Sequence, residues 1–96
     1  MDGEPFKDHE AKRRIKGILA NPAGIVQYSS HAKDQMKTRT LERADILNIL
    51  RGGKVEPPEE KDGKWAYRVR TNTMYVVIAF LSEHEMRVVT AWRKDP

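Results

Sequence analysis

The sequence contains no cysteine, which excludes a disulfide framework, a thiolate metal site and a cysteine nucleophile. No apolar run approaches the length of a membrane-spanning helix. The first residues, Met1 to Pro5, are acidic where a secretory signal would be basic and then apolar, so we expect no such signal. A chain without cysteine suits a reducing compartment, and we expect a cytoplasmic protein that does not associate with membranes.

Histidine is also scarce, and the three that occur are His9, His31 and His84. No two of them have helical spacing, and none has an acidic partner at the spacing of metal ligands. The sequence lacks a phosphate-binding glycine loop, because Gly52 and Gly53 end a helical pattern instead of starting one, and it lacks a Gly-x-Ser-x-Gly motif. We therefore expect neither a metal nor a cofactor, and we expect His9 and His84 to be solvated.

What the sequence does have is enough apolar residues for one small core, and an excess of positive charge. Its 96 residues predict a single domain, and 39% of them are hydrophobic. Lysine and arginine number 18 against 14 aspartate and glutamate, which gives a formal net charge of +4. A small basic domain suits a phosphate-rich partner such as RNA, or an acidic protein, although many domains are mildly basic without such a partner.

After a flexible arm at residues 1–7, the first half of the chain, residues 8–53, is predicted to be mainly helical. Apolar residues recur there at spacings of three and four, which is the period of a helix with one buried face. A short β-branched and aromatic segment interrupts the pattern, and serine or threonine precedes two of the helices as a candidate N-cap. The predicted helices are 8–20, 30–39 and 42–51, the strand is 25–28, and the candidate caps are Ser29 or Ser30 and Thr40.

Residues 54–93 change to an alternating pattern that predicts strands. The predicted strands are 54–56, 64–70, 73–81 and 86–93. Residues 59–63 are predicted to form a charged turn, and the almost continuously apolar strand 73–81 is predicted to be covered on both faces. Because helices come first and strands follow, we predict an α+β fold in which N-terminal helices pack on a small twisted antiparallel sheet.

A polar stripe on the second predicted helix is the first candidate site. His31, Gln35 and Arg39 recur every four residues, so Gln35 and Arg39 lie about 40° and about 80° around the helix from His31. Ala32 and Met36 fall beside this stripe and are expected to face the core, which would place the stripe along the wall of a cleft. An ordinary helix with solvated polar residues explains the same pattern.

Arginines on the predicted strands form the second candidate site. Arg68 and Arg70 alternate with Trp65 and Tyr67, so the arginines are predicted on the opposite face from the aromatic pair. Regular alternation in the last strand divides its residues into two faces: Arg87, Val89, Ala91 and Arg93 on one, and Val88, Thr90 and Trp92 on the other. If helices cover only one side of the sheet, the other side is an open cationic surface for a phosphodiester backbone. The ordinary alternative is the solvent face of a half-buried sheet.

Residues 29–41, Ser-Ser-His-Ala-Lys-Asp-Gln-Met-Lys-Thr-Arg-Thr-Leu, resemble the motif of a widespread family of small domains of unknown function. Members usually have Ser-x-His-Ala-x-x-Arg-Met-x-x-Arg-Gly-Ile, then a helix, a glycine and a hydrophobic strand. The matching residues are His31, Ala32, Met36, Arg39 and Leu41. Gln35 stands where arginine is commoner, and Thr40 replaces the usual glycine. With the later Ala-Asp-Ile-Leu-Asn-Ile-Leu, Gly-Gly-Lys-Val and strand segments, the resemblance covers about residues 25–93.

That family is similar to the RelE-like and MqsR-like toxins of bacterial toxin–antitoxin systems, within a broader group of metal-independent ribonucleases. The resemblance implies a RelE-like or microbial ribonuclease-like fold, and cleavage of RNA by its own 2′-hydroxyl, which needs a base, an acid and cations but no metal. It implies His31 as the acid or base. The catalytic cations would be Arg39, Arg68 and Arg70. The substrate-binding candidates are Gln35, which would orient the substrate, Lys33, Tyr75, Thr90 and Arg93.

Three functions follow as expectations. The first is a small endoribonuclease, the toxin of a pair whose antitoxin protein covers the cationic face, present as a monomer or as the toxin–antitoxin complex. The second is a non-catalytic module that binds nucleic acid or an acidic protein partner through Arg68 and Arg70. The third is an interaction domain whose exposed edge strand pairs with a strand of a partner.

Overall fold

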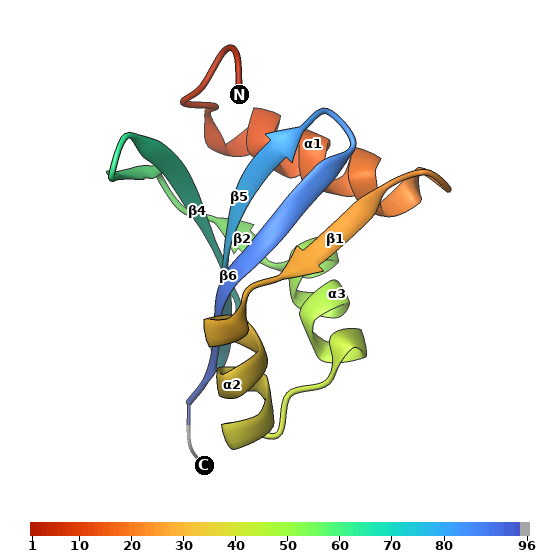
Figure 1. The fold of residues 1–96 in the computed structure, drawn as a ribbon, viewed down its shortest axis with the longest axis vertical. Coiled ribbons are helices and arrows are strands. Elements are labelled where there is room, and N and C mark those ends of the chain that lie inside the picture. The colour runs from red at the N-terminus through yellow and green to blue at the C-terminus, as the bar shows by residue number, and fades with distance from the viewer. Residues whose placement is uncertain (95–96) are drawn as a thin grey trace.

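The computed structural model describes residues 1–94, which form an α+β domain (Figure 1). In chain order its elements are α1 (Asp8–Ala20), β1 (Ile25–Tyr28), α2 (Ser30–Thr38), α3 (Arg43–Gly52), β2 (Lys54–Val55), β3 (Glu59–Lys61), β4 (Lys64–Arg70), β5 (Met74–Ser82) and β6 (Glu85–Arg93). The strands form one sheet in the order β1–β6–β5–β4–β2, and β3 also pairs with β4. The predicted α+β class is confirmed.

The sheet is mixed, so the prediction of a purely antiparallel sheet was wrong. β1 pairs with β6 in parallel, with Ile25 opposite Glu85 and Tyr28 opposite Val88. Alternation in a sequence carries no information on strand direction, and the long connection through α2, α3 and the middle strands lets β6 return beside β1 in the same direction. The predicted turn at residues 59–63 was also partly wrong, because Glu59–Lys61 is strand β3. All three of its residues are exposed, so no apolar alternation marks them.

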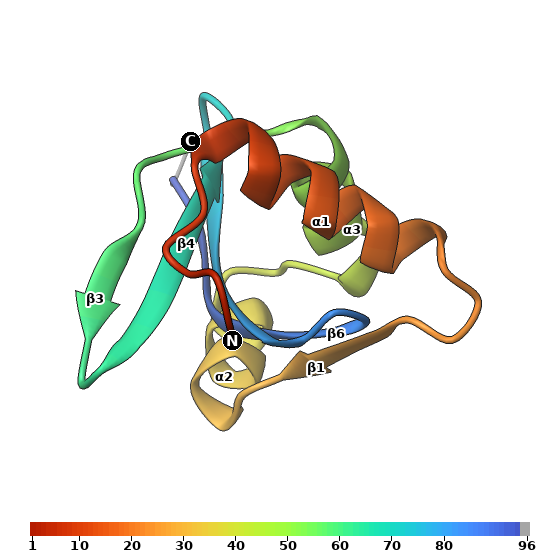
Figure 2. The same cartoon turned by 90° about the horizontal axis from the view of Figure 1, so that it is seen from above.

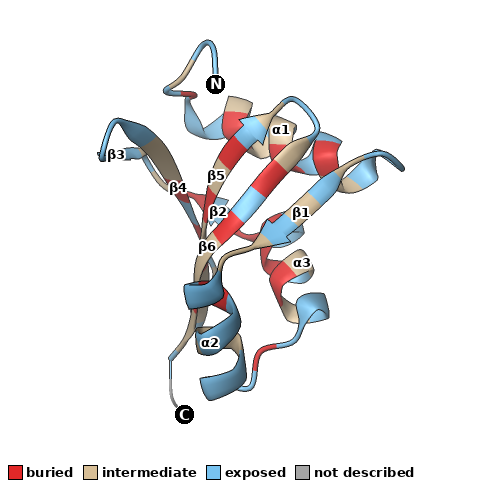
Figure 3. Cartoon of the chain, viewed as in Figure 1, coloured by how far each residue is buried: buried red, intermediate tan, exposed pale blue. Residues whose placement is uncertain are grey.

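Helices α1 and α3 cover one face of the sheet, as Figure 2 shows from above. The core lies between these helices and the strands, and the buried bands of Figure 3 fall on α1, α3, β5 and β6. Its fully buried large side chains are Ile15, Ile46, Ile49, Leu50, Tyr67, Val69, Val76, Ile78, Met86 and Val88. Helix α2 follows β1 and lies against β6 (Figure 1).

The opposite face of the sheet is called the open face from here on. Its residues are Ala66, Arg68 and Arg70 of β4, Tyr75, Val77 and Ala79 of β5, and Arg87, Thr90 and Trp92 of β6. Every one of them is at least partly exposed. The prediction that strand β5 is covered on both faces was therefore wrong, because α1 and α3 lie on the same side of the sheet.

A bulge in β6 decides which of its residues reach the open face. Val88 is opposite Ile78 while Thr90 is opposite Val77, so Val89 is an extra residue in the ladder. Beyond Val89, the residues that were predicted to share a face with Val88, namely Thr90 and Trp92, lie on the opposite face. The regular alternation expected from the sequence was wrong for residues 90–93 for this reason.

Residues 1–7 were predicted to form a flexible arm, and in the structure this segment contacts the core through Phe6. Phe6 is only 6% exposed, and its ring lies 6.3 Å from that of Tyr67 and 5.7 Å from that of Phe80. The Phe6 backbone N–H donates to the Tyr67 hydroxyl (2.9 Å), which donates to a carboxylate oxygen of Glu4 (2.9 Å). Burial raises the pKa of Tyr67 to about 12, so its hydroxyl keeps its proton near neutral pH. A lone phenylalanine in a polar segment has no periodicity that could signal this contact.

The structure shows which residues cap α2 and α3. Ser29 or Ser30 was predicted for α2, and Thr40 for α3. Ser29 caps α2, since its side-chain oxygen accepts from the Ala32 N–H at 3.0 Å. Helix α3 is capped by Glu42 in a capping box with Asp45, so the expected cap at Thr40 was wrong. Thr40 instead has a φ of +57°, a left-handed conformation that favours glycine.

Candidate nucleic-acid interface

Two arginines and two aromatic side chains form a row across the open face, called the stacked row from here on. The guanidinium carbon of Arg39 lies 4.7 Å from the centre of the Trp92 ring. The rings of Trp92 and Tyr75 stack with centroids 5.7 Å apart and planes 16° from parallel. The guanidinium carbon of Arg68 lies 4.4 Å from the centre of the Tyr75 ring. The row thus joins the C-cap of α2 with β6, β5 and β4.

Strand register and the bulge bring the stacked row together. Tyr75 is opposite Trp92 on β6 and opposite Arg70 on β4, and Arg68 is two residue pairs away along β4, opposite Val77. Directly opposed residues in neighbouring strands point to the same face. Without the bulge, Trp92 would point into the core, so the extra residue in β6 is what places an indole beside Tyr75.

Ser29, the N-cap of α2, and Gln35 within α2 hold the bulged strand in this position. The Ser29 hydroxyl donates to the Val89 carbonyl (2.9 Å), and the side-chain oxygen of Gln35 accepts from the Ala91 N–H (3.1 Å). β1 ends at Tyr28, so α2 supplies from there on the partners that an adjacent strand would supply. Gln35 was predicted to orient substrate, but its side-chain oxygen is bound to the backbone of β6. Its amide nitrogen remains available to donate to a ligand.

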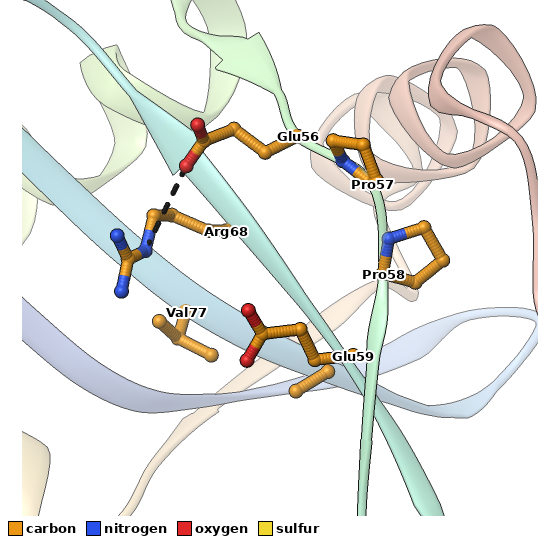
Figure 4. A pocket seen from close by; sticks show the side chains of 7 residues that line it. Glu56, Pro57, Pro58, Glu59, Arg68 and Val77 are labelled. Atoms are coloured by element: carbon orange, nitrogen blue, oxygen red, sulfur yellow. Dashed lines mark ion pairs between the residues drawn. The ribbon is translucent and has the colours of Figure 1, made fainter.

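One carboxylate neutralises part of the cationic surface. Glu56, directly after β2, has one oxygen 3.8 Å from Nε of Arg68 and the other 3.2 Å from Nε of Arg70. A hollow of about 380 Å³ lies beside this contact, lined by residues 56–59 and by Ala66, Arg68 and Val77. Figure 4 shows the carboxylates of Glu56 and Glu59 facing this hollow together with the Arg68 guanidinium.

His31 and Lys33 lie on the exposed side of α2, while Ala32 is fully buried and Met36 packs against the core as predicted. Within residues 1–94 the side chains of His31 and Lys33 make no hydrogen bond or ion pair. His31 precedes Arg39 by eight residues, which separates their backbones by about 12 Å along a helix axis. The predicted stripe therefore shares one helix, but only its end at Arg39 belongs to the stacked row.

The structure brings Arg39, Arg68, Arg70, Tyr75 and Thr90 to one face and places Arg93 on the other. Arg93 is opposite Met74, and its guanidinium is 3.7 Å from a carboxylate oxygen of Asp45 in α3. It therefore lies on the side that the helices cover. The predicted grouping of Arg93 with the other arginines was wrong because the bulge precedes it.

The sequence model of a family described as a domain of unknown function (DUF4258) matches residues 28–93. The chain belongs to this family. The DUF4258 segment contains α2, α3 and β2 to β6, and with them every residue of the stacked row and Glu56. No match was found among curated proteins or among solved structures.

Two residues of this candidate interface could not be predicted from the sequence, Trp92 and Glu56. Trp92 was assigned to the wrong face because the sequence of β6 does not show where its bulge lies. Glu56 precedes Pro57 and Pro58, which signal only that the strand ends, and its contacts with Arg68 and Arg70 lie 12 and 14 residues away along the chain.

The part of the DUF4258 chain that the structure describes has no helix long and apolar enough to cross a membrane. Among the same residues, 1–94, no three histidine, aspartate or glutamate side chains are placed to hold a metal ion.

Proposed function

We propose that this DUF4258 domain binds single-stranded RNA along the open face of its sheet. The stacked row is the observation that carries this proposal. Aromatic rings stack on bases of any sequence, and arginine guanidinium groups form paired hydrogen bonds with phosphate oxygens. A sheet with cations on both sides of two partly exposed rings offers both contacts to one strand of RNA.

In the free protein, guanidinium groups cover the two rings of the stacked row, and bases of bound RNA can take their places. The guanidinium groups of Arg39 and Arg68 lie over the rings of Trp92 and Tyr75, at the positions where bases would stack. A base that stacks on a ring displaces the guanidinium, and the displaced group is then placed to contact the neighbouring phosphate. Arg68 can move this way because its side chain is 50% exposed.

Arg68→Ala is expected to weaken binding of a fluorescein-labelled oligouridylate by about three- to tenfold and to reduce the slope of log K against log salt by about one. Fluorescence anisotropy over a salt series measures both. Arg13→Ala is the matched control, since Arg13 is an exposed arginine paired with Glu10 on α1 and its loss changes the net charge equally. Equal weakening by both replacements would show that net charge, and not the open face, attracts the RNA.

Glu56→Gln is expected to strengthen oligouridylate binding by about two- to fivefold, because it removes the carboxylate that competes with phosphate for Arg68 and Arg70. The control is Glu59→Gln, which makes the same change of charge three residues away in the same hollow. Among residues 1–94, Glu59 makes no ion pair. Glu59→Gln is expected to have the smaller effect, and a larger effect at Glu59 than at Glu56 would contradict the assignment.

The second candidate function is metal-independent cleavage of the bound RNA, by a toxin of the RelE-like and MqsR-like kind whose antitoxin covers the open face. The observation that favours it is the placement of His31. An imidazole that is exposed in the first turn of α2 stands beside the unpaired amides of a helix start, on the helix that ends with Arg39. His31 would act as the acid or base, and the stacked row would hold the strand about two helical turns away.

His31→Ala is expected to lower the rate of RNA cleavage by about 10²- to 10⁴-fold and to leave oligouridylate affinity within about twofold of wild type. Cleavage is measured in excess EDTA, with His84→Ala as control because His84 is exposed in the β5–β6 turn. Undiminished cleavage by His31→Ala would remove His31 from the mechanism. Binding without cleavage of any RNA by the wild type would leave the non-catalytic RNA-binding function.

A further inference from the structure

Strands β4 and β5 separate part-way along their length. They pair from Tyr67 opposite Ile78 to Arg70 opposite Tyr75. Among residues 1–94, Lys64–Ala66 before this stretch pairs with β3 only, and Ala79–Ser82 after it pairs with β6 only. Figure 1 shows the β3–β4 hairpin turning away from β5 and β6, and Figure 2 shows the same separation from above. We call this separation the fork.

An aromatic cluster lies where the two hairpins separate. The rings of Tyr67 and Phe80, one from each hairpin, are 5.2 Å apart, and Phe6 contacts both from the helix side. This cluster closes the inner end of the fork. The fork therefore cannot be closed by drawing β4 and β5 together, because the buried rings occupy the space between the hairpins.

The cavity in the fork is bounded by the edges of strands. Its volume is about 600 Å³, and it is lined by the consecutive residues Trp65 and Ala66 of β4 and by residues 79–81 of β5. Consecutive residues of a strand point to opposite faces, so a cavity that contacts both members of such a pair faces the backbone edge of the strand. Each hairpin thus presents to the cavity an edge beside which the described part of the chain places no strand.

The side chains around the fork define what kind of strand fits there. Apolar side chains of Trp65, Phe80, Leu81 and Val89 form much of the lining. Lys61, Lys64 and Arg87 surround them. The acidic side chains at the cavity are Asp62 and Glu4, and Glu4 is already engaged by the Tyr67 hydroxyl.

From the two unpaired edges, the apolar lining and the three cations, we infer that the fork binds an extended acidic peptide segment of a protein partner, which adds as a strand between the two hairpins. Its backbone pairs with Lys64–Ala66 on one side or Ala79–Ser82 on the other, its apolar side chains enter the cavity, and its carboxylates meet Lys61, Lys64 and Arg87. This site is separate from the stacked row and does not depend on RNA binding.

The test uses a capped peptide of alternating glutamate and valine, with an otherwise identical peptide N-methylated at alternate residues so that it cannot pair as a strand. Amide hydrogen exchange followed by NMR reports on Lys64–Ala66 and Ala79–Ser82, and the Trp65 indole N–H reports on the cavity. The unmodified peptide is expected to slow exchange in at least one of the two segments by about tenfold or more and to shift the Trp65 indole, and the N-methylated peptide to do neither.

Two variants test whether the peptide binds in the fork. Leu81→Asp, at a residue 39% exposed in the cavity lining, is expected to weaken the peptide about tenfold, whereas Ile25→Asp, at a residue 46% exposed on β1, is expected to change it less than twofold. Unchanged exchange at about 1 mM peptide, equal slowing by the N-methylated peptide, or equal weakening by both variants would overturn the proposal. Protection of these segments by oligouridylate in place of the peptide would also overturn it, because the fork would then belong to the RNA-binding surface.

Discussion

Replacing Trp92 and Tyr75 together with leucine is expected to weaken oligouridylate binding by about a hundredfold. Each base stacked on an aromatic ring contributes about 1–3 kcal/mol, and each 1.4 kcal/mol is tenfold in affinity. The two rings are stacked on one another and each is covered by a guanidinium, so their removal takes away the surface on which both bases lie. Leucine keeps an apolar side chain on the sheet but has no π face.

The matched control replaces the other tryptophan and another tyrosine, Trp65 and Tyr28, with leucine. Trp65 lines the fork, and Tyr28 lies in β1 beneath Arg43. Fluorescence anisotropy measures binding, and urea unfolding shows that each variant is folded. The stacked row is not the RNA site if the control pair weakens binding as much as the Trp92 and Tyr75 pair, or if the latter retains affinity within twofold of wild type.

Phe6→Ala is expected to lower the free energy of unfolding by about 3–5 kcal/mol, which is a large part of the stability of a domain of this size. The Phe6 ring contacts Tyr67 and Phe80, and the guanidinium of Arg14 lies 4.2 Å from its centre. Its backbone N–H also donates to the buried Tyr67 hydroxyl, so loss of the ring loosens that hydrogen bond as well.

Urea unfolding of Phe6→Ala, Phe6→Leu and Lys7→Ala measures this effect. Phe6→Leu keeps most of the buried volume and is expected to cost about 1 kcal/mol, and Lys7→Ala, at an exposed neighbour, is expected to change stability by less than about 0.5 kcal/mol. A loss below about 1 kcal/mol in Phe6→Ala would show that residues 1–7 behave as the flexible arm that their sequence predicts.

The helices were predictable because each has an apolar face with the helical period. Ile15 and Ile18 of α1 and Ile46 and Leu50 of α3 are buried at such spacings, and the bounds of α1 were predicted to the residue. The direction of β1 was not predictable, since it depends on how the chain returns after α3. Strand β3 was missed because its residues, exposed on both faces, contact β4 through backbone hydrogen bonds that no side chain signals.

Which residues of the candidate site share a face could be predicted within one strand. Which residues of neighbouring strands come together could not. Arg68 and Arg70 alternate with buried Tyr67 and Val69, which alone places both arginines on one face. The far side of the site depends on the single extra residue Val89, which brings Trp92 to that face and sends Arg93 to Asp45. The hydrogen bond from Ala91 to Gln35, a contact between residues 56 positions apart, holds that arrangement and has no counterpart in local sequence patterns.

The two indole N–H resonances of the chain provide the most direct test of RNA binding on the open face. Trp92 lies in the stacked row and Trp65 lines the fork, so one ¹⁵N–¹H spectrum recorded during titration with oligouridylate reports on both surfaces at once. If RNA binds on the open face, we expect a saturable shift of the Trp92 indole while the Trp65 indole stays in place. A titration in which oligouridylate binds and the Trp92 indole does not move would contradict it.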